Sequence, residues 1–83
     1  MSADNFIAVF SEKDSLGRDM RWYVAEGMMP SIESDEDTEK WKNHIIEKHT
    51  NNRWDYPTRE SALVAAHDML KRKYIVEYGV IEI

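Results

Sequence analysis

The last part of the chain, residues 53–83, constrains the fold most, because the spacing of its apolar residues changes twice along the segment. Trp54-Asp55-Tyr56 alternates apolar and polar residues, which is typical of a short strand, and Pro57-Thr58 ends that run. Residues 59–74 carry apolar residues at helical spacing, and residues 75–83 return to β-branched and aromatic residues. The pattern predicts a strand, a helix and a second strand, all built on one sheet.

The helix expected at 59–74 has clear start and stop signals. Thr58 offers a side-chain oxygen to the amides of the first turn, and Pro57 discourages an earlier start. A full capping box is not expected, because Ser61 rather than Glu or Gln stands three residues after Thr58. Cations at 71–73 complement the helix dipole. The face that should pack on the sheet is formed by Ala62, Leu63, Ala66, Met69 and Leu70.

The N-terminal part of the chain predicts a hairpin. Asn5–Phe10 and Met20–Glu26 both alternate in the manner of strands, and Gly27 ends the second one. The two strands place apolar residues on both sides, so that Phe6 and Phe10 oppose Ile7 and Val9. Both faces of the sheet therefore need a cover. The candidates are a helix from the middle of the chain, a second copy of the chain, or a foreign protein.

The middle of the chain is a compositional break, with five acids in residues 31–39. Such charge runs are usually solvated, and we interpret this one mainly as a loop. Part of it can also begin a helix, since Ser34 is a suitable cap and acids favour a first turn. We expect a short helix from about Asp35 to His49, with Trp41 and Ile45 along one side.

These elements predict one α+β domain spanning residues 1–83. It consists of a hairpin at 1–30, an acidic loop and short helix at 31–52, and the strand–helix–strand unit at 53–83. The sheet should be small and largely antiparallel, with the main helix of the unit packed on one face.

Composition excludes several classes of protein. The chain has no cysteine, which removes disulfides and thiol chemistry. No apolar run reaches the roughly 20 residues of a membrane span, and the N-terminus lacks the features of a signal peptide. We therefore expect a cytoplasmic protein without a membrane association. The net charge is −5, and residues 1–39 alone hold ten acids against three bases.

No pattern of catalytic or ligating residues stands out. His44 and His49 are five apart rather than four, so they do not share a helical face. The acidic run lacks the ligand spacing of a calcium loop. With three glycines there is no loop that could cradle a phosphate. We expect no enzyme activity, no catalytic residues, no metal site and no cofactor.

The net negative charge and the two apolar faces of the sheet together favour a protein-binding module. An acidic surface suits a basic protein surface and repels nucleic acid. A possible homodimer follows from the two apolar faces. The alternative is a small nucleic-acid-associated regulator that uses Trp22, Tyr23, Tyr78 and the basic cluster 71–73. The residues expected to contact a partner protein are Glu33, Asp35, Glu36, Asp37, Glu39 and Trp41.

Two segments carry a resemblance. The first is the opening Met1-Ser2-Ala3-Asp4-Asn5-Phe6, and the second is residues 56–63 with Ala65-Ala66-His67, followed by Glu77-Tyr78-Gly79-Val80. They resemble a loose group of small uncharacterised bacteriophage and prophage proteins. The resemblance implies an accessory protein of the host cytoplasm without an assigned activity. By analogy with small acidic phage proteins, we expect it to bind and inhibit or modulate a host protein, including defence machinery. It implies no site residues, and the acidic segment and Trp41 lie outside it.

Overall fold

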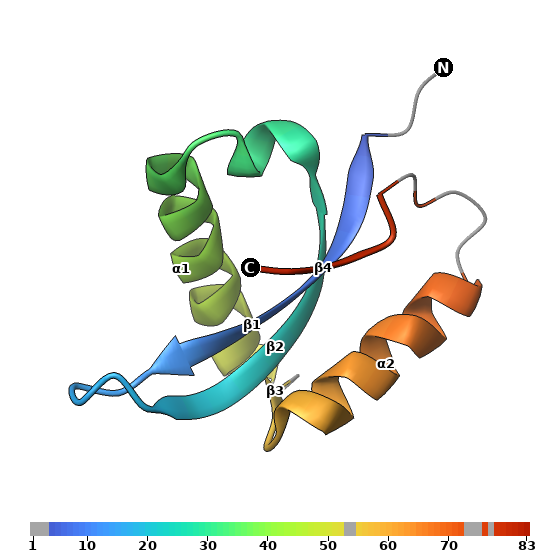
Figure 1. Cartoon of the computed structure of the whole chain (residues 1–83). Coiled ribbons are helices and arrows are strands. Elements are labelled where there is room, and N and C mark those ends of the chain that lie inside the picture. The colour runs from blue at the N-terminus through green and yellow to red at the C-terminus, as the bar shows by residue number, and fades with distance from the viewer. Residues whose placement is uncertain (1–3, 53–54, 73–75, 77) are drawn as a thin grey trace.

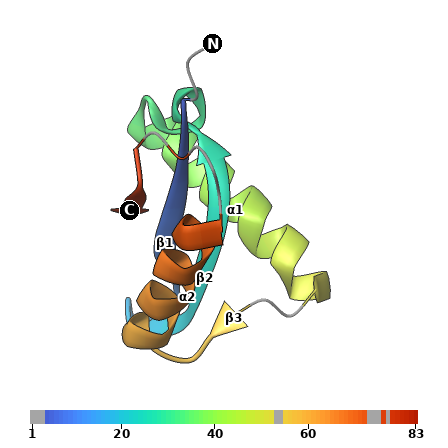
Figure 2. The same ribbon diagram turned by 90° about the vertical axis from the view of Figure 1, so that its right-hand side faces the viewer.

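The computed structural model describes residues 4–52, 55–72, 76 and 78–83. A sheet lies between two helices, with α1 on one face and α2 on the other (Figures 1 and 2). Among the described residues no helix combines the length and the apolar character of a membrane span. In chain order the elements are β1 (Asn5–Lys13), β2 (Asp19–Met28), the 3-10 helix η1 (Met29–Ile32), α1 (Asp35–Asn52), β3 (Asp55–Tyr56), α2 (Arg59–Arg72) and β4 (Val80–Glu82).

The sheet confirms the predicted α+β class, but it is mixed. Its strand order is β3-β2-β1-β4. β1 pairs antiparallel with β2, and β2 pairs antiparallel with β3, whereas β4 joins β1 in parallel. β3 and β4 therefore run in the same direction at opposite edges. A connection between parallel strands needs a crossover, and α2 supplies it.

The face under α2 agrees with the prediction. Ile7, Val9 and Val24 from the sheet are buried with Ala62 and Ala66 from the helix. Alanine lets the helix backbone approach the strands, so the two alanines are fully buried while the longer side chains around them are half-buried. That partly buried set includes Leu63, Met69 and Leu70.

The face under α1 contains the aromatic part of the core. Phe6 and Phe10 are fully buried, and the ring of Trp41 lies 5.4 Å and 5.9 Å from theirs, centroid to centroid. Gly27 leaves room for this packing, since a Cβ there would lie 2.7 Å from Cζ2 of Trp41. The middle helix is thus the cover of the second face. The apolar second face is therefore no longer an argument for a homodimer. Homodimerisation stays a prediction, which sedimentation can test.

α1 begins at Asp35, as the expected helix does, but it is longer than expected. The interpretation of 31–39 mainly as a loop was wrong, because the helix begins at Asp35 and η1 precedes it. Ser34 is the cap, as predicted, and its Oγ accepts a hydrogen bond of 3.1 Å from the amide of Asp37. With 18 residues α1 is longer than α2, which has 14. It is therefore not the short helix that we expected.

α2 begins where the sequence predicts, but with a fuller cap. The amide of Ser61 donates to Oγ1 of Thr58 at 3.1 Å, and the amide of Thr58 donates back to Oγ of Ser61 at 3.3 Å. A serine hydroxyl thus performs the return bond that Glu or Gln makes in a capping box. The expectation of an incomplete box was wrong. The predicted strand residue Trp54, the helix end at 73–74 and the strand start at Ile75 lie outside the described residues.

Candidate interaction surface

The five acids predicted to contact a partner all lie on the surface. Asp35, Glu36, Asp37 and Glu39 occupy the start of α1, and Glu33 precedes it; all are exposed. Their position is also favourable for the helix, because negative charge complements the positive end of its dipole. We call these five residues the acidic end of α1.

Two of the five carboxylates lie near lysines of the same helix. Glu36 pairs with Lys40 at 3.2 Å, and Glu39 approaches Lys42 at 3.7 Å. Within the described part of the chain, the other three acids make no ion pair. The acidic end therefore keeps an excess of negative charge that faces solvent.

Trp41 is placed differently from the acids with which it was grouped. Its ring packs on Phe6 and Phe10 and joins the core, so its first role is structural. It remains half-buried and forms part of the wall of a shallow hollow of about 360 Å³, together with Asp37 and His44. The structure thus brings Trp41 and Asp37 together, and contact between Trp41 and a partner stays a prediction.

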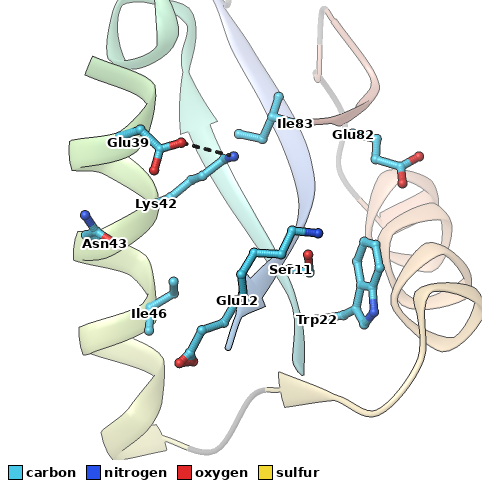
Figure 3. Close-up of a pocket in the computed structure, with 10 residues that line it drawn as sticks. Ser11, Glu12, Trp22, Glu39, Lys42, Asn43, Ile46, Glu82 and Ile83 are labelled. Carbon is cyan, nitrogen blue, oxygen red and sulfur yellow. Dashed lines mark ion pairs between the residues drawn. The ribbon is translucent and has the colours of Figure 1, made fainter. Parts of the chain in front are cut away.

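A second, larger hollow lies between α1 and the end of β1, with a volume of about 450 Å³ (Figure 3). We call it the β1 groove. Lys42 and Ile46 point into it from α1, and Trp22 lies on its opposite side. Ser11 and Glu12 line it from β1. The sequence analysis missed this groove, because residues far apart in the chain meet only through the strand order.

Lys42 is an unusual residue in the wall of the groove. Its side chain is only 19% exposed, and among the described residues the carboxylate of Glu39 at 3.7 Å is the closest charged partner. That separation is too long for a hydrogen bond. Across the groove, Glu12 accepts a hydrogen bond of 3.1 Å from the hydroxyl of Tyr23. Burial, and then this contact with Glu12, raise the pKa of Tyr23.

An ion pair holds the end of β4 against the start of α2. Nε and a terminal nitrogen of Arg59 donate to the two carboxylate oxygens of Glu82 at 2.6 Å and 2.7 Å. The two parallel bonds match the fork of the guanidinium to the carboxylate. The hydrogen bonds from Arg59 hold the pKa of Glu82 below its ordinary value. Both side chains are substantially exposed, so solvent screens the pair.

The depressed pKa of Glu82 predicts a pH dependence of stability. A carboxyl group with a lower pKa in the folded state stabilises the fold above its unfolded pKa, and the effect is lost as pH falls through the folded pKa. Between about pH 5 and pH 3, the melting temperature of the natural protein should fall more steeply than that of Glu82→Gln. Thermal unfolding followed by circular dichroism measures both slopes. Equal slopes would show that the pair does not contribute in solution.

The alternative reading as a nucleic-acid regulator required aromatics on an open sheet face. Tyr23 is 1% exposed under α1, and Trp22 is half-buried on the side of α2. That platform is therefore not formed, although Tyr78 is exposed. In the basic cluster, Arg72 pairs with Asp68 at 2.8 Å, Lys71 is exposed, and Lys73 lies outside the described residues.

No set of three or more histidine, cysteine or acidic side chains that could hold a metal ion occurs in the described residues. No family model, no curated protein and no solved structure matches this chain. The resemblance to phage and prophage proteins therefore stays a prediction from the quoted segments. The functional argument rests on the surface itself.

Proposed function

We propose that this protein is a non-catalytic binding module whose acidic end of α1 engages a basic surface of another protein. The observation that carries the proposal is the gathering of five exposed carboxylates at one helix end. Charge of one sign on an exposed surface steers a complementary partner and raises the rate of encounter. The capped helix start keeps these groups on a regular element, so little backbone ordering is needed on binding.

The class of partner follows from the resemblance noted in the sequence. Under this proposal the partner is a host protein with a basic surface, and the module inhibits or modulates it in the host cytoplasm. Anti-defence activity fits this role. The covered sheet faces also support binding through the helix end and the groove rather than through an open sheet face.

The test replaces the acidic end by its neutral isosteres, with Glu→Gln and Asp→Asn at 33, 35, 36, 37 and 39. A partner is first captured from host lysate with the natural protein and identified. We expect the neutral variant to associate about tenfold more slowly at low salt, with a flatter salt dependence, because steering acts on the on-rate. Stopped-flow or biosensor kinetics across a salt series measure this.

A matched control neutralises five exposed acids elsewhere, which changes the net charge equally. The control positions are Glu26, Glu47, Asp55, Glu60 and Asp68. The control should keep most of the association rate and of its salt dependence. If the two variants slow association equally, net charge alone is responsible and the acidic end is not the contact. Circular dichroism should show both variants folded, since exposed ion pairs contribute little to stability.

A further inference from the structure

The shallow hollow beside Trp41 lies between η1 and the first half of α1, two consecutive elements that Figure 1 shows next to each other. We call it the Trp41 hollow. Its volume of about 360 Å³ is at the lower end of the range of ligand pockets, which suits one long side chain better than a strand or a helix. The residues that line it are Pro30, Ser31, Asp37, Lys40, Trp41 and His44.

The core of the protein holds both walls of the Trp41 hollow. On the α1 side, the ring of Trp41 packs on two buried phenylalanine rings. On the η1 side, Met29 and Ile32 pack on the same core cluster, and Pro30 and Ser31 stand between them in the chain. Both walls are therefore in place before a ligand arrives, which lowers the cost of ordering on binding.

The carboxylates around the Trp41 hollow outweigh its cation. Asp37 is exposed, and within the described part of the chain its carboxylate makes no ion pair. The ammonium of Lys40 is already opposed by the carboxylate of Glu36 at 3.2 Å. The three remaining acids of the acidic end, at 33, 35 and 39, stand within four positions of Asp37 in the chain. A cation that enters the hollow therefore meets the negative charge of several carboxylates.

An indole and a carboxylate in one hollow together fit an arginine side chain. A guanidinium group is planar and weakly hydrated, so it can pack on an aromatic ring while its N–H groups donate to a carboxylate. The methylene stem of arginine is apolar, and the ring of Pro30 offers it an apolar wall. Lysine has a compact, strongly hydrated charge, which matches the carboxylate but makes less use of the indole.

We propose that the Trp41 hollow binds one arginine side chain of the partner protein, with the guanidinium against the indole of Trp41 and its N–H groups on the carboxylate of Asp37. The inference rests on the proposed function and adds to it the residue type that the partner inserts and the place where it is held. The acidic end of α1 steers the partner and sets the association rate. The hollow retains it and sets the dissociation rate.

The test uses three short blocked peptides in which two lysines flank a central arginine, lysine or citrulline. The lysine peptide keeps the charge of the arginine peptide, and citrulline keeps the shape of arginine without its charge. The arginine peptide should shift the NMR signal of the Trp41 indole N–H and bind about threefold or more tighter than the lysine peptide. It should bind about fivefold or more tighter than the citrulline peptide.

Three results of this titration overturn the proposal. The first is equal binding of the arginine and lysine peptides, which would show that only charge is recognised. The second is equal binding of the arginine and citrulline peptides, which would show that the hollow takes an uncharged side chain. The third is an indole N–H signal of Trp41 that does not move at millimolar concentrations of the arginine peptide.

Asp37→Asn and Asp35→Asn form a matched pair of variants. Each removes one exposed carboxylate from the first turn of α1, and within the described residues neither carboxylate is ion-paired. Only Asp37 lines the hollow. Asp37→Asn should weaken the arginine peptide about fivefold or more, whereas Asp35→Asn should bind it within about twofold of the natural protein. Equal weakening by the two substitutions overturns the site at Asp37.

Kinetics with the captured host partner distinguish this inference from the proposed function. A third variant carries neutral isosteres at 33, 35 and 39; it keeps Asp37, and it keeps Glu36 opposite Lys40. If this variant slows association while Asp37→Asn leaves dissociation unchanged, the proposed function stands and the hollow is overturned. If Asp37→Asn speeds dissociation about fivefold while the third variant associates as fast as the natural protein, the hollow stands and the acidic end is overturned as the steering surface.

Sedimentation tests the other possible source of the arginine. A homodimer that Asp37→Asn dissociates and Asp35→Asn does not would make an arginine of a second copy the occupant of the hollow, which overturns the foreign partner. A natural protein that sediments as a monomer, and still binds the arginine peptide through Asp37, supports the proposal.

Discussion

Replacing Trp41 by alanine is expected to lower the free energy of unfolding by about 3 kcal/mol, the lower part of the range for large aromatic residues in cores. Its ring packs on both Phe6 and Phe10 at the interface of α1 with the sheet. Removing it leaves a cavity where α1 is held to β1. Small domains have a stability of about 5–15 kcal/mol, so the loss is a large fraction of the total. Urea unfolding followed by circular dichroism measures it.

Tyr78→Ala is the aromatic control for this prediction. Tyr78 is 47% exposed, so its removal should cost about 0.5 kcal/mol or less. If Trp41→Ala costs no more than this control, Trp41 does not anchor α1 to the sheet. Its assignment as a contact for a partner would then become the better explanation of this large, half-buried aromatic residue.

Ala66→Leu is expected to destabilise the protein by roughly 1–3 kcal/mol, because the added atoms have no space. Ala66 is fully buried between α2 and the sheet, in the cluster that contains Ile7 and Val9. A leucine there must push the helix away from the strands or adopt a strained rotamer. Thermal unfolding should show a clear decrease in melting temperature.

Val64→Leu is the matched control, since it also places a leucine on α2. Val64 is 71% exposed, and its replacement should change stability by about 0.5 kcal/mol or less. Equal effects of the two substitutions would show that Ala66 does not face the sheet. The face assignment of α2 would then be wrong.

The inner faces of β1 and α2 illustrate how far the sequence predicts the fold. The alternation of residues 6–10 correctly assigned Phe6, Ala8 and Phe10 to one face of β1 and Ile7 and Val9 to the other, because a strand has a period of two. The helical spacing of Ala62 and Ala66 correctly identified the inner face of α2. Both predictions depend on local periodicity, which the order of the residues contains directly.

The acidic end of α1 was predicted only in part. That its five acids are exposed follows from their charge. That they begin a long helix instead of forming mainly a loop depends on the cap at Ser34 and on the packing of Trp41 and Ile45, which stabilise α1 on the sheet. The local charge pattern contains no information about this packing between distant residues, so the interpretation of the segment mainly as a loop was wrong.

The sequence by itself determined the hairpin, the helix α2, the inner faces of β1 and α2 and the acidic character of the surface, because these depend on neighbours within a few positions of the chain. Only the tertiary structure decided that α1 covers the second face, that β4 joins β1 in parallel, and that β1 extends past it. Those features depend on contacts between residues far apart in the chain. The β1 groove belongs to this second group, since its lining residues come from β1, β2 and α1 and meet only in the folded chain.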